Sequence, residues 1–150
     1  MIPEPLKSNP LFSTLGSEEQ ERLFGYFTQK KFSKNGTIFV EKMTGESMYF
    51  INSGKIILTR MVSEGVEKNL AELSSGESFG ELALIDSGPR AVTARALEDT
   101  DIYLLSQEGF HRLLAEDPSL GIKFVLNLFR RVVLELREAV SLISEGLSRR

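Results

Sequence analysis

The segment FGELALIDSGPRAVTARA, residues 79–96, gives the strongest indication of fold and site in this 150-residue chain. Glu81 opens an apolar run without a helix breaker, so a short helix there would place unpaired N-terminal amides beside a carboxylate, and such amides bind anions. Arg90 follows nine residues later at the start of a predicted strand. Its planar, permanently charged guanidinium suits two oxygens of one phosphate. These residues predict a pocket for a phosphorylated ligand, in which Glu81 is free to accept a sugar hydroxyl.

This segment resembles the phosphate-binding cassette of the cyclic nucleotide-binding domain family, which includes bacterial catabolite-activator-type regulators, cyclic nucleotide-dependent protein kinases and cyclic nucleotide-gated channels. The positions that match the family's pattern are Gly80, Glu81, Leu82, Ala83, Pro89, Arg90, Ala91, Ala94 and Ala96. The resemblance implies that Glu81 binds a ribose 2′-hydroxyl and Arg90 a cyclic phosphate, while nearby backbone amides complete the site. The ligand-binding residues implied are Phe79, Gly80, Glu81, Leu82, Ala83, Arg90, Ala91 and Glu135.

An exposed Glu–Arg ion pair on an ordinary β-protein is the alternative interpretation, and such a pair is worth about 0 to 1 kcal/mol. It explains neither Gly80 nor the small residues that follow Arg90. An enzyme is the least favoured class of protein. The single histidine, His111, lies in a short amphipathic segment, and no G-x-S-x-G motif occurs.

Short strands punctuated by glycine are predicted over residues 31–106. Turn residues such as Asn35 and Gly36 supply the positive φ angles that the connections need. So many short strands at near-regular spacing favour a sandwich or a jelly-roll barrel. The strand candidates are 37–40, 47–52, 55–62, 66–73, 90–98 and 101–105. The predicted fold class is mainly β with flanking helices: a β-roll, or jelly-roll-like antiparallel barrel, with a short N-terminal helix and a long C-terminal helix.

The N-terminal segment, residues 1–10, contains three prolines and is predicted to be extended. Ser17 and Gln20 have the spacing of a capping box, which predicts a short helix that runs to about Phe27. The side chains of this region that we expect to face the core are Leu15, Leu23 and Phe27.

Two C-terminal helices are predicted after the roll. Ser106 is expected to cap a short helix that ends near Glu116, and Asp117 to cap a long one with Pro118 at its first position. No proline interrupts the long helix before about Glu145, so it would span about 42 Å. Residues 1–150 are therefore predicted to form one cyclic nucleotide-binding domain, with a helix and β-roll over about 12–105 and C-terminal helices over about 106–146.

The long helix carries an apolar face that is too wide for one coiled-coil seam. In heptad notation the a positions are Ile122, Phe129, Leu136 and Ile143, and most d, e and g positions are also apolar. One side can lie on the roll while the other meets the same helix of a second copy, which predicts a homodimer. The alternative is a helix wholly buried within one subunit. Arg130 and Arg131 fall at positions b and c, where we expect solvent exposure.

The composition excludes several classes of protein. The 18 basic and 21 acidic residues give a net charge of −3 without a long basic stripe, so nucleic acid is not an expected partner. The absence of cysteine excludes disulfides, thiolate nucleophiles and cysteine zinc sites, and the spacing of the carboxylates predicts no metal site. Neither a run of about 18 apolar residues nor a secretion signal occurs. We therefore expect a cytoplasmic protein without membrane insertion.

Cyclic AMP is the predicted ligand, and the choice of base depends on Ala91. In members of the family that prefer cyclic GMP this position is often threonine, whose hydroxyl can bond the guanine 2-amino group, so cyclic GMP is less favoured here. Glu135 has two interpretations. Its carboxylate could bind the base, or it could pair with Arg131 one helical turn earlier, which is worth only a few tenths of a kcal/mol.

The predicted function is that of a stand-alone cyclic nucleotide sensor, a regulatory domain in signal transduction that catalyses no reaction. Ligand would draw the cassette helix toward the phosphate, and Leu82, Leu84 and Ile85 would repack against the long helix. The sequence stops at Arg150 without the helix-turn-helix of transcription-factor members, so we expect the output to be an unknown effector protein or the oligomeric state. The alternatives are a dimerisation scaffold with an idle pocket, and a sensor of cyclic GMP or a cyclic dinucleotide.

Overall fold

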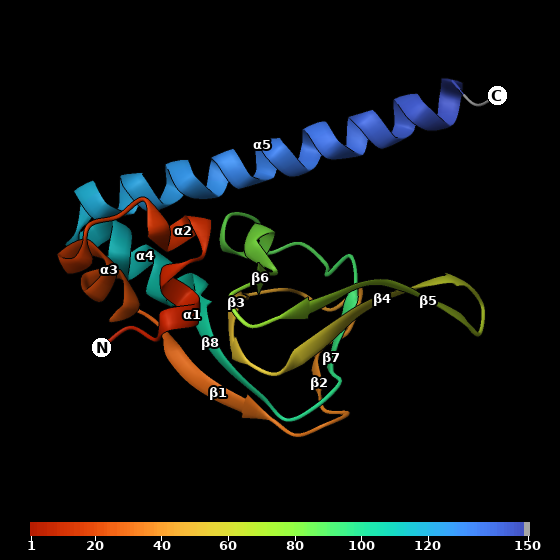
Figure 1. The fold of residues 1–150 in the computed structure, drawn as a ribbon, viewed down its shortest axis with the longest axis horizontal. Helices are drawn as coiled ribbons and strands as arrows, with labels where there is room; N and C mark the ends of the chain where they lie inside the picture. Colours follow the sequence, from red (N-terminus) through yellow and green to blue (C-terminus); the bar gives the residue numbers. More distant parts are fainter. Residues whose placement is uncertain (149–150) are drawn as a thin grey trace.

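The structure is a computed structural model that describes residues 1–148 and contains two antiparallel four-stranded sheets with helices packed at one end (Figure 1). One sheet has the strand order β1-β8-β3-β6 and the other the order β2-β7-β4-β5. The strands are β1 (Thr28–Phe32), β2 (Thr37–Phe39), β3 (Ser47–Ser53), β4 (Lys55–Ser63), β5 (Val66–Ser74), β6 (Ser78–Phe79), β7 (Thr93–Ala96) and β8 (Thr100–Ser106). The predicted fold class, a β-roll with flanking helices, is confirmed.

The core has two parts, and alternate residues of β3 contribute to each. Ile51 is fully buried among apolar residues from both sheets, so it belongs to the interior of the roll. Phe50 points to the other face, where it meets Phe12 and Phe27 with ring centroids 5.3 and 5.2 Å away in edge-on contacts. This second part lies under the helices and joins them to the roll.

The N-terminal segment is not extended as predicted but forms two short helices, α1 (Glu4–Lys7) and α2 (Pro10–Ser13). Proline is tolerated in the first turn of a helix, because the N–H that it lacks would have no partner there. Pro10 occupies the first turn of α2, and Asn9 caps that helix by accepting a hydrogen bond from the amide of Leu11 at 2.9 Å. Burial of Leu6 and Leu11 holds both helices on the core.

The next helix, α3 (Ser17–Phe24), begins as predicted but is capped differently. Gly16 is the cap residue, and the side chain of Glu19, rather than that of Gln20, accepts from its amide at 3.3 Å. The amide side chain of Gln20 instead donates to the backbone oxygen of Phe12 at 2.9 Å. The helix ends before Phe27, but all three side chains belong to the core as predicted: Leu15 and Leu23 are buried in one core cluster and Phe27 packs against that cluster.

The strand predictions are correct for the long hairpins and wrong near the short strands. Strands β1 and β6 were not predicted, and the strand expected over residues 90–98 begins only at Thr93. Arg90 lies before it, in a segment whose backbone pairs with a turn: its amide donates to the oxygen of Met43, and its oxygen accepts from the amide of Lys42, both at 2.7 Å. These hydrogen bonds hold the chain close to the turn instead of in the sheet.

The two C-terminal helices are α4 (Gln107–Glu116) and α5 (Pro118–Ser148). Ser106 caps α4 as predicted, accepting from the amide of Gly109 at 3.0 Å, and Asp117 accepts from the amide of Leu120 at 3.4 Å in the first turn of α5. Within residues 1–148, none of the helices combines the length and the apolar character that crossing a membrane requires.

Only the first part of α5 packs against the rest of the chain. Leu120, Phe124 and Leu128, spaced by single helical turns, are almost fully buried. The second half extends away from the other helices (Figure 1), and its residues from 134 to 147 are all exposed. The predicted a positions are exposed as well, at 60% for Ile122, 65% for Phe129, 62% for Leu136 and 63% for Ile143. The helix is therefore not wholly buried within this subunit.

We expect Leu120→Ala to lower the free energy of unfolding by about 2 to 5 kcal/mol, because it leaves a cavity where α5 meets the core. Leu134→Ala is the matched control, since Leu134 lies on the same helix with 64% of its surface exposed, and it should change that free energy by less than about 0.5 kcal/mol. Urea denaturation followed by circular dichroism measures both. Equal losses in the two variants would contradict this account of how α5 is held.

Candidate ligand-binding site

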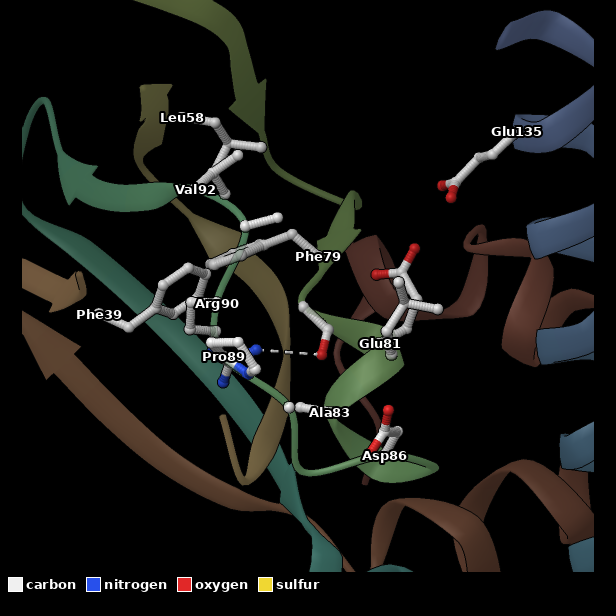
Figure 2. A pocket seen from close by; sticks show the side chains of 14 residues that line it. Phe39, Leu58, Phe79, Glu81, Ala83, Asp86, Pro89, Arg90, Val92 and Glu135 are labelled. Carbon is white, nitrogen blue, oxygen red and sulfur yellow. Dashed lines mark hydrogen bonds between the residues drawn. The ribbon is translucent and has the colours of Figure 1, made fainter. Parts of the chain in front are cut away.

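A cavity of about 510 Å³ opens between the roll, α5 and η1 (Glu81–Leu84), a single turn of 3₁₀-helix. This volume is within the usual range for a small-molecule site, about 300 to 1,000 Å³. All eight residues predicted to bind ligand line it: Phe79, Gly80, Glu81, Leu82, Ala83, Arg90, Ala91 and Glu135. They come from the segment around η1, from the loop after it and from α5, and Figure 2 labels five of them: Phe79, Glu81, Ala83, Arg90 and Glu135. Ligand binding by these residues stays a prediction.

Arg90 is an almost buried cation, with 8% of its surface exposed. Its guanidinium donates to the backbone oxygen of Ser47 at 2.7 Å and to that of Gly80 at 3.3 Å, and it lies 4.1 Å from the ring centroid of Phe39. The buried Nε atom has no hydrogen-bond partner. Burial lowers the pKa of Arg90, because it removes water that would stabilise the charge. Buried polar groups normally have partners, so this unpaired Nε is an exception among the described residues.

Two glycines make room for this guanidinium. A side chain on Gly45 would place its Cβ 2.6 Å from Nε of Arg90, and one on Gly80 would lie 2.8 Å from its Nη1. Gly80 also has a φ of +75°, which residues with side chains rarely adopt. Gly45 was not among the predicted site residues. Its only signal in the sequence is a glycine in a turn, which does not reveal the distant arginine.

Glu81 is the first residue of η1, and only 6% of its surface is exposed. Its Oε1 lies 3.0 Å from Nε of Arg131 on α5. Burial raises the pKa of Glu81 more than this ion pair lowers it, and the neighbouring carboxylate of Glu135 raises it further. Figure 2 shows the carboxylates of Glu81 and Glu135 turned toward one another at the edge of the cavity.

Arg131 is a further residue at the site that sequence reasoning missed. It was expected to be solvent-exposed, but its side chain is 25% exposed and contacts three partners. Besides Glu81 it pairs with Glu135 at 3.2 Å and donates to the hydroxyl and, at 2.8 Å, to the backbone oxygen of Ser78. The heptad pattern describes only the helix itself, whereas the end of β6 approaches α5 at this point. Glu135 thus forms the predicted pair with Arg131 and also lines the cavity.

The remainder of the cassette is held by packing and by one glutamine. Phe79 is buried and stacks on Tyr49 with ring centroids 5.1 Å apart, and the side chain of Gln107 donates to the backbone oxygen of Ala83 at 3.0 Å. Further residues of the cavity that were not predicted are Phe39, Leu58, Asp86, Gly88, Pro89 and Val92. In residues 1–148, no cluster of His, Cys, Asp and Glu is arranged to hold a metal ion.

Glu81→Gln should be more stable than the wild type at about pH 8, with a difference that shrinks toward about pH 4. An acid whose pKa is raised by folding destabilises the fold once ionised, so wild-type stability falls as pH rises through the folded-state pKa of Glu81. Thermal melting of both proteins across this range measures the difference, with the exposed Glu64→Gln as control. A wild type that is the more stable protein at pH 8 would show that the ion pair with Arg131 outweighs burial.

Residues 29–117 match the family model described as the cyclic nucleotide-binding domain. The chain is 36% identical over 134 residues to a "Cyclic AMP receptor protein" of Thermus thermophilus, covering 89% of this chain and 60% of that protein. It is 35% identical over 114 residues to a "cAMP-dependent protein kinase regulatory subunit" of Debaryomyces hansenii, covering 76% of this chain and 24% of that protein. The chain thus spans less than two thirds of the length of either relative.

Solved structures agree with the sequence comparison. The Thermus thermophilus catabolite activator protein superimposes with a TM-score of 0.78 at 34% identity, over 91% of this chain and 63% of that one. The N-terminal domain of a transcriptional regulator from Streptomyces coelicolor A3(2) gives a TM-score of 0.81 at 28% identity, over 91% of this chain and 95% of that one. On sequence and fold together, this chain belongs to the cyclic nucleotide-binding domain family.

Proposed function

We propose that this chain is a cytoplasmic, non-enzymatic sensor that binds cyclic AMP and transmits ligand occupancy through α5. The observation that carries the proposal is the buried Arg90, which has an unpartnered Nε and is surrounded by carbonyl oxygens and aromatic rings. A buried cation without a matching acid favours an anionic ligand. A cyclic phosphodiester supplies one negative charge in a compact group, and Arg90 and η1 both line the cavity that would receive it.

The remaining parts of a cyclic nucleotide match other parts of the cavity. Glu81 and Arg90 both line the cavity and lie apart from one another in it (Figure 2), so the carboxylate of Glu81 would accept a ribose hydroxyl while Arg90 binds the phosphate. Leu58, Val92 and Leu82 supply apolar surface against which a base could pack. These features support a ribose phosphate with a base over a simple inorganic anion.

The preference for adenine rests on Ala91, whose side chain has neither donor nor acceptor for the guanine 2-amino group. The pairing of Glu135 with Arg131 supports the same choice, because a carboxylate held by an arginine is less available to bind the base. Cyclic GMP and cyclic dinucleotides are the alternative ligands. The relatives named above as a cyclic AMP receptor and as a cAMP-dependent kinase subunit also favour cyclic AMP.

Cyclic AMP should stabilise the fold, by about 2.7 kcal/mol at 100 times its dissociation constant, and 5′-AMP and cyclic GMP should do so much less. Arg90→Leu should abolish this shift, because it removes charge-assisted hydrogen bonds worth about 1.5 to 3 kcal/mol each. Differential scanning fluorimetry with each nucleotide is the measurement. Arg95→Leu is the control, since Arg95 lies on neighbouring β7 and pairs with Glu67 at the surface.

Equal shifts with cyclic AMP and 5′-AMP, or an Arg90→Leu protein that binds within about tenfold of the wild type, would contradict the proposed site. The absence of a shift with every cyclic nucleotide tested would favour the alternative of a dimerisation scaffold with an idle pocket.

The output is proposed to begin at η1. Leu84 was expected to move with this segment, but it is 1% exposed and already part of the core. Leu82 and Ile85 are each 64% exposed, so they are the side chains with room to repack against α5 when ligand draws η1 toward the phosphate. The readout is then a change in an effector protein or in the oligomeric state.

A homodimer through α5 is proposed as the assembly that carries this signal. Large apolar side chains along the outer part of the helix are exposed: Leu126, Phe129, Leu134, Leu136, Val140, Leu142, Ile143 and Leu147. Such a run on one helix is costly in water and suits the same helix of a second copy.

Phe129→Glu combined with Leu136→Glu should give monomers, because the substitutions would bury four like charges across a two-fold seam. Leu134→Glu is the control: Leu134 is as exposed as Leu136, at 64% against 62%, but lies off the predicted seam. It should leave the dimer intact. Multi-angle light scattering at micromolar concentration reports the mass of each protein, and a wild-type monomer would reject the seam.

A further inference from the structure

A polar cluster joins α5 to the cassette, and Arg131 is at its centre. Its guanidinium contacts Glu81 of η1 at 3.0 Å, the hydroxyl and backbone oxygen of Ser78 on β6, and Glu135 one turn further along α5. Ser78 in turn accepts a hydrogen bond from the side chain of Asn9 at 3.1 Å. One side chain of α5 therefore contacts two elements of the cassette region and, through Ser78, the cap of α2.

Arg131 uses only part of the acceptor capacity of the Glu81 carboxylate. An ionised carboxylate offers about four acceptor positions on two oxygens. Nε of Arg131 lies 3.0 Å from Oε1, and Glu81 lines the cavity, where its carboxylate has capacity for a further donor. The Glu81 side chain is 8% exposed, so without Arg131 its charge would have little compensation. A buried carboxylate without a partner takes up a proton or turns toward water.

We propose that Arg131 is a positioning residue that keeps Glu81 ionised and turned toward the cavity, ready to accept a ribose 2′-hydroxyl. The proposal rests on the cyclic nucleotide function proposed above and deepens it, because it ties the same site to α5. Arg131 acts through Glu81 and does not itself contact the ligand.

The position of Arg131 along the helix gives this contact a second role. Residues before it, such as Leu128, are buried in the core, whereas every residue from 134 to 147 is exposed. The ion pairs of Arg131 with Glu81 and with Glu135 therefore lie at the point where α5 leaves the body of the protein. The carboxylate that receives the ribose is the one that holds this point of α5.

The test compares cyclic AMP with 2′-deoxy cyclic AMP by isothermal titration calorimetry. In the wild type, the deoxy compound should bind about tenfold or more weakly, since a hydrogen bond to a charged group is lost. Arg131→Gln should weaken cyclic AMP by a similar factor and leave the deoxy compound unchanged, so the ribose preference disappears. Arg131→Lys should restore part of it. Arg130→Gln is the matched control and should preserve it, because Arg130, among the described residues, pairs with Asn127 on its own helix at 3.0 Å and not with Glu81.

The outcomes of this experiment distinguish the proposed cyclic nucleotide function from the proposed role of Arg131. A wild type that binds neither nucleotide rejects the proposed function and this role with it. A wild type that binds both, and an Arg131→Gln protein that keeps the full ribose preference, overturn the role of Arg131 alone. A uniform loss of affinity for both nucleotides in Arg131→Gln also overturns it, since that result indicates a structural role.

A double variant tests the role of Arg131 if the Arg131→Gln protein does not fold. Glu81→Gln combined with Arg131→Gln contains no uncompensated buried carboxylate, so it is expected to fold where the single variant fails. It should bind cyclic AMP within about threefold of Glu81→Gln alone, because Arg131 acts only through Glu81. A further tenfold loss in the double variant would show that Arg131 acts on the ligand by another route.

Discussion

The buried guanidinium of Arg90 is the constraint on which the remaining geometry of the site depends. A cation at this depth is tolerable only if neighbouring atoms replace its water. Carbonyl oxygens of Ser47 and Gly80 and the ring of Phe39 do so in part. Their convergence requires backbone at distances that a side chain on Gly45 or Gly80 would prevent. The turn before β3 and the turn before η1 are therefore shaped by one charge.

Arg90 and Glu81, two of the charged residues that line the cavity, are kept apart rather than paired with each other. Arg90 is surrounded by neutral groups, and Glu81 is paired with an arginine from a different element. If the two neutralised one another, neither would be available to a ligand. The arrangement costs stability in the free protein, as the raised pKa of Glu81 indicates, and strained or costly groups of this kind are common at binding sites.

The sequence predicted the features that depend on residues close to one another in the chain. These features are the cassette, the hairpins of β3 to β5, the caps at Ser106 and Asp117, and the wide apolar face of α5. The N-terminal helices were misjudged because prolines were interpreted as breakers, although Pro10 occupies the first turn of α2. Arg131 and Gly45 could not be assigned, because their partners lie on distant elements that only the folded chain brings near.

The unsupported length of α5 has a mechanical consequence. From Arg131 to its last described turn the helix extends about 25 Å, at 1.5 Å per residue. A tilt of about 10° at its last fixed point would displace the far end by about 4 Å, roughly the width of a side chain. Under the proposed function, a small rearrangement around one carboxylate would thereby be magnified into a displacement that another protein surface could register. The helix would then act as a lever whose pivot lies beside the pocket.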